Sequence, residues 1–361
     1  MKKLDVLVFG AGAIGTYIGG SLAQAGHSMT FIERPQPAEE LRRCGLTLQF
    51  SDGRIYNHQN PRVVTSMAEA VAAGPFEVAI FALKAYDTAA ALEAIQPYAD
   101  KIPPLLCLQN GVENEAAISE VLGKEKVIAG SVTSAVGRRG VGNIVVERQR
   151  GVGIAGGHPL SAQICAAMNE AGLNATLFNS ASDLKWSKML TNLLANASSA
   201  ILNMSPEDIY AHAGLYRIEV GQIRECLAVM KAQGIHPVDL PRTPVRALVW
   251  GAALPRSLTQ LVGARAIGKS RGNKMPSFHI DLYNNARHSE VVFLNGAVVR
   301  FGDRFGITTP VNCFLTQTLV ALTNGDIPLN TFDHAPDKFV FNYQILQTAK
   351  KVRNPRVIVH S

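Results

Sequence analysis

The stretch Val6-Leu7-Val8-Phe9-Gly10-Ala11-Gly12-Ala13-Ile14-Gly15 decides the fold of this chain. Its four leading apolar residues are typical of a strand that is buried on both faces. The next six match the glycine pattern G-x-G-x-x-G, and a helical pattern follows from Ile14 to Ala25. In this context the glycines allow a tight turn, a close approach of a pyrophosphate, and close packing of the helix on the strand. Because free N–H groups and the dipole of a helix start attract phosphate, residues 10–15 are predicted to bind a dinucleotide.

The end of the second expected strand, Phe31-Ile32-Glu33-Arg34, should lie near the adenosine ribose of that dinucleotide. An acidic residue at this place usually binds the ribose 2′-OH of NAD, whereas an arginine accommodates the 2′-phosphate of NADP. Glu33 and Arg34 are both present, so the pair alone leaves the two cofactors open. A Glu33 that turns toward solvent would leave Arg34 to bind a 2′-phosphate.

The first half of the chain alternates short apolar runs with helical patterns, which indicates a mostly parallel α/β sheet. We therefore predict an N-terminal Rossmann domain over residues 1–180. Two hairpins are also expected, one joining residues 46–50 to 54–56 and one joining 143–146 to 152–155 around the turn 148–151. After residue 180 the periodicity is helical throughout, so we predict an all-helical C-terminal domain over residues 181–328. Residues 329–361 are expected to form a C-terminal extension.

One predicted helix, Asp183 to Ile201, carries Lys188, Asn192 and Asn196 at positions i, i+4 and i+8. This spacing places three polar side chains on one slowly turning stripe of an otherwise apolar helix. The stripe either faces solvent or lines a polar cleft. Asparagine is a mediocre helix former, and exposed helix positions normally favour Glu, Lys or Gln, so the residue types favour the cleft.

The composition limits the possible partners. The chain has 361 residues, 47% of them apolar and 17% charged, and its net charge is 35 − 28 = +7, which suits anionic small ligands. Its basic residues are not interleaved with aromatic ones, so nucleic acid is not expected as a partner. The five cysteines are far apart and show no ligand spacing, so neither a disulfide framework nor a metal site is predicted. Reduced thiols lead us to expect a cytoplasmic protein. Without an apolar run of about 18 residues, we expect no membrane span.

The segment between Asp239 and Asp281 contains no acidic residue. It is either a solvated rim or a positive collar that steers an anionic ligand. Its basic residues are Arg242, Arg246, Arg256, Arg265, Lys269, Arg271 and Lys274.

Over roughly residues 4–325 the chain resembles the ketopantoate reductase (2-dehydropantoate 2-reductase) family. The resemblance rests on five blocks in order. They are the glycine loop 10–15, Phe81-Ala-Leu-Lys84-Ala-Tyr, Leu108-Gln-Asn110-Gly-Val, Trp186-Ser-Lys188-Met-Leu-Thr-Asn192-Leu-Leu-Ala-Asn196, and Met275-Pro-Ser277 through Asp281 and Glu290 to Leu294-Asn-Gly296.

The resemblance implies a Rossmann domain and a helical domain with a cleft between them, NADP(H) as cofactor, and NADPH-dependent reduction of a 2-oxo acid, 2-dehydropantoate or similar, in pantothenate biosynthesis. It also allows a homodimer. Lys188 would protonate the carbonyl oxygen, with Glu290 as a second catalytic residue that bonds cofactor or substrate. Substrate-binding residues would be Asn110, Asn192, Asn196 and Ser277. Cofactor-binding residues would be Gly10, Ala11, Gly12, Ala13, Ile14, Gly15, Arg34, Lys84, Asn110, Ala135 and Glu290.

Several features depart from the family pattern and bear on the substrate. The segment 237–276 is longer than usual, and the Asp281–Glu290 spacing is one residue longer than expected. After Asn196 the family often has another substrate-binding asparagine, whereas this region reads Asn203-Met-Ser-Pro206-Glu, and the tail past Pro328 is additional. Ser277 as a helix cap and Glu290 as an exposed acid are the alternatives to their site roles. Two other functions remain: a dehydrogenase of the hydroxyacid-phosphate or opine type, and a non-catalytic nucleotide-sensing protein.

Overall fold

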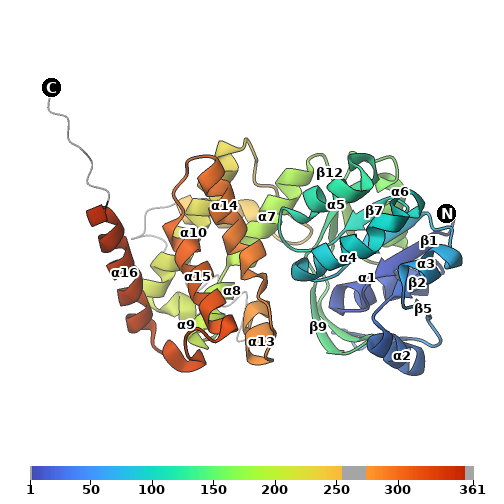
Figure 1. Ribbon diagram of the computed structural model, residues 1–361, viewed down its shortest axis with the longest axis horizontal. Helices are drawn as coiled ribbons and strands as arrows, with labels where there is room; N and C mark the ends of the chain where they lie inside the picture. The colour runs from blue at the N-terminus through green and yellow to red at the C-terminus, as the bar shows by residue number, and fades with distance from the viewer. Residues whose placement is uncertain (1, 254–273, 354–361) are drawn as a thin grey trace. The chain divides into compact units, whose positions relative to one another are not determined.

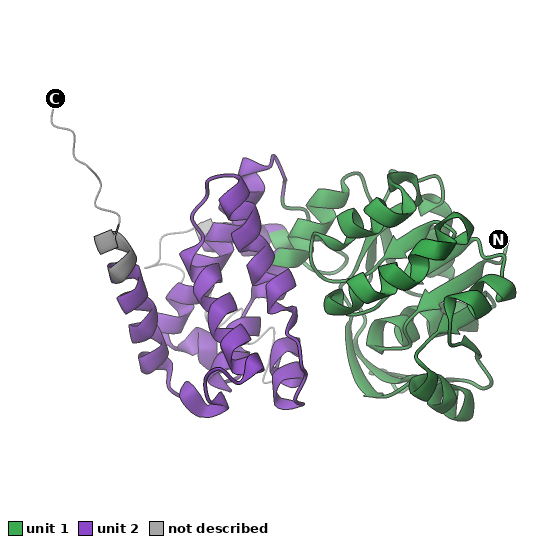
Figure 2. Cartoon of the chain, viewed as in Figure 1, with its two compact units in different colours: residues 1–189, 237–245 green, residues 190–236, 246–361 purple. Residues whose placement is uncertain are grey.

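The computed structural model describes residues 2–253 and 274–353 (Figure 1). The chain divides into two compact units (Figure 2): unit 1 contains residues 1–189 and 237–245, and unit 2 contains residues 190–236 and 246–361. This division differs from the boundary expected at residue 180, because the first part of the helix α7 (Ala181–Leu193) packs within unit 1. The returning segment 237–245 joins it there, since the Val238 N–H donates to Ser187 Oγ at 2.9 Å.

Unit 1 is built on an eight-stranded sheet in the order β12-β11-β8-β7-β6-β1-β2-β5. Neighbouring strands run parallel except β11 and β8, so that β11 and β12 oppose the other six. This arrangement confirms the predicted α/β Rossmann fold. The strands are β1 (Asp5–Phe9), β2 (Ser28–Ile32), β5 (Arg62–Val64), β6 (Val78–Phe81), β7 (Leu105–Cys107), β8 (Val127–Val132), β11 (Val152–Ala155) and β12 (Ala175–Phe178).

Both faces of the sheet are covered, as the continuous apolar run of β1 requires. Val6 and Val8 pack in one hydrophobic cluster with α1 and α6, while Leu7 and Phe9 pack in another with α3, α4 and α5. Figure 1 shows these helices on the two sides of the strands. The helices of unit 1, besides the first part of α7, are α1 (Ala13–Gln24), α2 (Pro35–Cys44), α3 (Met67–Ala73), η1 (Ala85–Asp87), α4 (Thr88–Ile95), η2 (Gln96–Lys101), α5 (Asn114–Leu122), η3 (Lys124–Lys126) and α6 (Ser161–Glu170).

A second sheet, in the order β4-β3-β10-β9, contacts α1. Its strands are β3 (Leu46–Phe50), β4 (Ile55–His58), β9 (Ala135–Gly140) and β10 (Asn143–Arg148). The predicted hairpin of β3 and β4 is confirmed. The hairpin predicted for residues 143–155 is wrong, because β10 pairs with β3 and β9 whereas β11 belongs to the main sheet. The link between them crosses from one sheet to the other, and the N–H groups of Arg150 and Gly151 donate to Ser134 Oγ at 3.0 and 3.2 Å.

Unit 2 is helical throughout its described residues, as predicted. Part of the expected extension, the helix α16, belongs to its core: Phe339 is fully buried, with its ring centroid 4.8 Å from that of Phe314 on α15. No helix within residues 2–253 and 274–353 is long and apolar enough to span a membrane. After the end of α7, the unit contains α8 (Asn196–Leu202), α9 (Pro206–Ala211), α10 (Ala213–Ala232), α11 (Val245–Ala253), α13 (Ser277–Tyr283), η4 (Glu290–Phe293), α14 (Asn295–Arg304), α15 (Pro310–Asn324), η5 (Leu329–Thr331) and α16 (Pro336–Arg353).

Candidate active site

The glycine loop connects β1 to α1, and it leaves space for a ligand at its second glycine. A Cβ built on Gly15 would lie 1.8 Å from the carbonyl oxygen of Gly10, so the helix packs directly on the loop at the third glycine. A Cβ built on Gly12 would meet no heavy atom within 4 Å. Gly12 is also the N-cap of α1 and provides no side-chain cap to its first N–H groups. An open loop at an uncapped helix start fits the pyrophosphate of a dinucleotide.

Glu33, at the end of β2, is tied to the same loop. Its Oε1 accepts a hydrogen bond from the Ala11 N–H at 2.6 Å, and its Oε2 accepts one from the Arg34 N–H at 3.2 Å. The outward-turned Glu33 considered above is therefore not the conformation of this structure. Arg34 is exposed and serves as the N-cap of α2. The carboxylate lies where a Rossmann domain receives the adenosine ribose.

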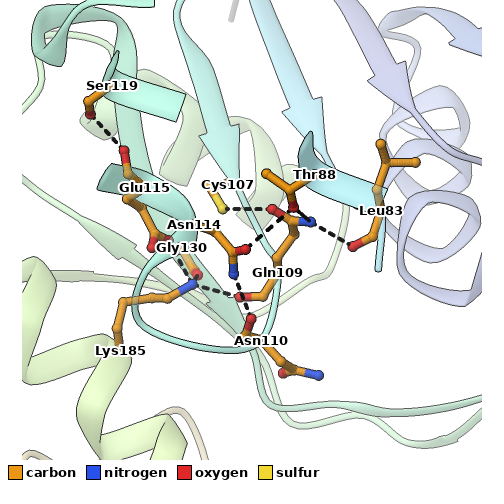
Figure 3. Close-up of polar contacts among 10 residues, drawn as sticks. All are labelled: Leu83, Thr88, Cys107, Gln109, Asn110, Asn114, Glu115, Ser119, Gly130 and Lys185. Atoms are coloured by element: carbon orange, nitrogen blue, oxygen red, sulfur yellow. Dashed lines mark hydrogen bonds and ion pairs between the residues drawn. The ribbon is translucent and has the colours of Figure 1, made fainter. Parts of the chain in front are cut away.

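Lys84 and Asn110 follow the next two strands, β6 and β7, and both are half-buried. Because β1, β6 and β7 are adjacent and parallel, their carboxyl ends and the glycine loop lie along one edge of the sheet. The Gln109 amide joins the two loops. Its Nε2 donates to the carbonyl oxygen of Leu83 at 3.1 Å (Figure 3) and to that of Lys84 at 3.2 Å. Three of the predicted cofactor-binding parts, the glycine loop, Lys84 and Asn110, thus lie along one edge of the main sheet of unit 1. Ala135, another of them, is half-buried at the start of β9.

A buried lysine of α7, Lys185, was not predicted from the sequence as a residue of the site. Its side chain is 5% exposed, and its Nζ donates to the carbonyl oxygens of Gln109 at 2.6 Å and Gly130 at 3.3 Å. It also forms an ion pair with Glu115 Oε1 at 2.7 Å (Figure 3). Burial by itself lowers the pKa of Lys185, but the Glu115 carboxylate outweighs burial and the pKa is raised. The spacing i, i+4, i+8 that aligns Lys185 with the buried Met189 and Leu193 was the available signal.

The single helix predicted from Asp183 to Ile201 is wrong, because the structure has two helices in its place. The predicted stripe of three polar side chains on one helix is therefore interrupted. Ala195 adopts φ 50° and ψ 12°, so Lys188 and Asn192 lie on α7 whereas Asn196 begins α8. Two side chains of α10 hydrogen-bond the backbone between the two helices. The Ala195 N–H donates to Glu219 Oε2 at 2.7 Å, and Gln222 Nε2 donates to the Leu193 carbonyl at 3.1 Å. Lys188 and Asn192, four residues apart on α7, are both half-buried.

Asn196 and Ser277 are brought together in unit 2. The Asn196 side chain is 5% exposed; its Nδ2 donates to Ser277 Oγ at 3.4 Å, and its Oδ1 accepts from the Phe278 N–H at 3.0 Å. Ser277 is the first residue of α13 and is exposed. Glu290 begins η4 and is 3% exposed, so the alternative of an exposed acid is wrong for this residue.

The acid-free segment is only partly described. Arg242 donates to the Gln149 carbonyl at 3.3 Å within unit 1. Half of the long segment 237–276, residues 254–273, lies outside the described residues, and with it Arg256, Arg265, Lys269 and Arg271.

Two family models match the chain. The model described as "Ketopantoate reductase PanE/ApbA" matches residues 6–156, and the model described as "Ketopantoate reductase PanE/ApbA C terminal" matches residues 181–323. The 2-dehydropantoate 2-reductase of Lactococcus lactis is 24% identical over 319 residues, which cover 87% of this chain and 96% of that protein. The 2-dehydropantoate 2-reductase of Archaeoglobus fulgidus is 26% identical over 332 residues, which cover 90% of this chain and 98% of that protein.

Solved structures are similar over most of their length. A ketopantoate reductase from Ralstonia eutropha superposes with a TM-score of 0.74 at 27% identity, covering 89% of this chain and 99% of that one. D-mandelate dehydrogenase, solved with NADH and anilino(oxo)acetate, superposes with a TM-score of 0.73 at 22% identity, covering 91% of this chain and all of that one (100%). At this identity the second likeness concerns the fold alone.

Proposed function

Because the chain belongs to the ketopantoate reductase family, we propose that it reduces a 2-oxo acid, 2-dehydropantoate or a similar acid, to the 2-hydroxy acid with a nicotinamide dinucleotide. The main support is the sheet edge of unit 1, where the open loop at Gly12 adjoins the strand ends that carry Lys84 and Asn110. Relatives named 2-dehydropantoate 2-reductase support the reaction class.

The residues of the chain divide the work around the reacting carbonyl. When bound, the reduced cofactor supplies a hydride to the carbonyl carbon. Lys188, in its ammonium form, donates a proton to the carbonyl oxygen, where negative charge develops. A half-buried lysine suits this role because its ammonium group supplies both the proton and a positive charge beside the developing negative charge.

The remaining predicted residues hold substrate and cofactor. Asn192, Asn196 and Ser277 offer amide and hydroxyl groups to the oxygens of the acid. Asn110 orients the nicotinamide and the substrate, while Glu290, a buried acid, accepts hydrogen bonds from either. Hydrogen bonds to a charged carboxylate are stronger than those to a neutral ketone, so these groups favour an acid as substrate.

Two nicotinamide cofactors compete at the end of β2. The family resemblance favours NADPH, with Arg34 forming paired hydrogen bonds to the 2′-phosphate. The contact of Glu33 with the Ala11 N–H favours NADH as a second candidate, because it holds a carboxylate at the ribose position and would repel a phosphate there. NADPH therefore requires Glu33 to leave this contact.

Oxidation of NADPH and NADH against a panel of 2-oxo acids that includes ketopantoate tests the proposal. We expect turnover of at least one acid, and its loss in Lys188→Ala. Amino acids paired with 2-oxo acids, added to the panel, test the opine alternative. Phosphorylated hydroxy acids, supplied with the oxidised cofactors NADP+ and NAD+, test the hydroxyacid-phosphate alternative by the appearance of the reduced cofactor. Cofactor binding without turnover of any compound would favour the non-catalytic nucleotide-sensing alternative.

A further inference from the structure

One buried hydrogen-bond network in unit 1 joins three segments that carry proposed site residues. They are the loop after β6 with Lys84, the loop after β7 with Asn110, and the helix α7 with Lys188. Figure 3 shows the side chains of Gln109 and Lys185 at the centre of this network. Neither belongs to the proposed site itself.

Gln109 fixes the two loops to one another. Its side-chain amide donates to the carbonyl oxygens of Leu83 and Lys84 and to Thr88 Oγ1, the last at 2.8 Å. Gln109 is 4% exposed, so water cannot easily replace these partners. The backbone of Lys84 therefore follows any displacement of Gln109.

Lys185 fixes the backbone next to Asn110. Its Nζ donates to the Gln109 carbonyl, which belongs to the peptide unit that precedes Asn110, while the carbonyl of Asn110 itself accepts from Asn114 Nδ2 at 2.7 Å. Both peptide units of Asn110 are thus held. The ammonium group donates hydrogen bonds to the carbonyl oxygens of Gln109 and Gly130, and its charge is paired with that of Glu115 at 2.7 Å.

We propose that Lys185 and Gln109 are positioning residues of this reductase, which hold Asn110, Lys84 and the helix of Lys188 in one fixed arrangement through the carbonyl of Gln109. The inference rests on the proposed function for the roles of those three residues. Lys188 follows Lys185 by less than one helical turn, so a shift at Lys185 is transmitted to it. Misplacement of a reacting group by about 1 Å lowers the rate roughly 10²-fold.

The ion pair with Glu115 has a different role. Removing Lys185 alone leaves a carboxylate at 17% exposure without its cation, which destabilises the fold whether or not positioning matters. Neutralising Glu115 as well removes that penalty while the Gln109 carbonyl still lacks its donor. The double variant Lys185→Met/Glu115→Gln therefore separates the effect of Lys185 on the stability of the fold from its effect on the position of Asn110.

The experiment compares Lys185→Met, Glu115→Gln, the double variant and Lys126→Met in the full chain. Lys126 is a matched control, because its Nζ also donates to backbone carbonyls, of Ala99 and Asp100 at 2.8 and 3.3 Å. It precedes the amino end of β8, whereas Asn110 follows the carboxyl end of the parallel strand β7. We expect kcat to fall about 10²-fold in both Lys185 variants, with the dissociation constant of the reduced cofactor within about threefold of the wild type. Glu115→Gln and Lys126→Met should keep kcat within about threefold, even if Tm falls.

The decisive comparison is the double variant. Its Tm should rise above that of Lys185→Met, because neither charge is left buried without its partner, while kcat stays low, and hydrogen exchange of residues 108–114 should be faster than in Glu115→Gln. A kcat that recovers together with Tm would reduce Lys185 to a structural residue and overturn the inference. If the wild type reduces no compound of the panel, the proposed function fails, and the exchange rates alone then judge the network: unchanged rates in both Lys185 variants refute it.

Discussion

The Glu33 carboxylate accepts a 2.6 Å hydrogen bond from the Ala11 backbone N–H, so the end of β2 and the glycine loop form one unit. The bond uses an N–H of the loop that binds phosphate in Rossmann domains, and it holds a negative charge beside that loop. The neighbouring Arg34 supplies the opposite charge. Cofactor choice thus depends on whether a bound cofactor bonds this carboxylate or displaces it.

Substitutions of this pair should change the cofactor preference in opposite directions. Arg34→Ala should weaken NADPH binding by about 1–3 kcal/mol, the scale of a charged hydrogen bond, and leave NADH binding nearly unchanged. Glu33→Gln removes the negative charge but keeps an oxygen that can accept from Ala11, so it should raise the affinity for NADPH relative to NADH. Fluorescence titration of both reduced cofactors measures these effects. Equal losses for both cofactors in Arg34→Ala would exclude a role in binding the 2′-phosphate.

Replacement of the proposed proton donor should act on turnover rather than on cofactor binding. Lys188→Ala should lower kcat by about 10²–10⁴, the usual contribution of a general acid. The cofactor dissociation constant should stay close to that of the wild type. Because only the ammonium form donates a proton, wild-type turnover should decline at high pH, and steady-state rates across pH measure this. An alanine variant that keeps most of its activity would make the polar positions of α7 an ordinary wet helix surface.

The sequence predicted the elements governed by local rules and failed where tertiary contacts decide. The apolar run of β1 and the glycine spacing around Gly12 determine a strand, a turn and a helix through nearby residues alone, and all three were predicted. The break at Ala195 was not, because alanine is a good helix former and the residues that hold the break, Glu219 and Gln222, lie on another helix. The buried position of Lys185 likewise depends on acceptors from the loop after β7, from β8 and from α5.

The backbone of Ala195 gives a prediction about stability. A left-handed conformation costs a residue with a Cβ roughly 1–2 kcal/mol, and glycine avoids this cost. Ala195→Gly should therefore raise Tm, because it relieves strain at φ 50° while the Glu219 bond to the backbone N–H remains. The control Ala197→Gly, inside α8, should lower stability by about 1 kcal/mol. Thermal unfolding of both variants provides the measurement, and a lower Tm for Ala195→Gly would contradict this account of the break.

The response of turnover to salt tests the expected charge of the substrate. The net charge of +7 and the acid-free segment 240–280 favour an anionic ligand, and electrostatic steering weakens as ionic strength rises. The value of kcat/KM for a 2-oxo acid should therefore fall between low and high salt. A neutral ketone of the same shape should be a poor substrate at either salt concentration, because it lacks the carboxylate that Asn196 and Ser277 are proposed to bind. Parallel assays of one matched acid and ketone, with an uncharged osmolyte as the control for viscosity, separate steering from general solvent effects. Equal turnover of the ketone, or a rate independent of salt, would show that these residues do not select a carboxylate.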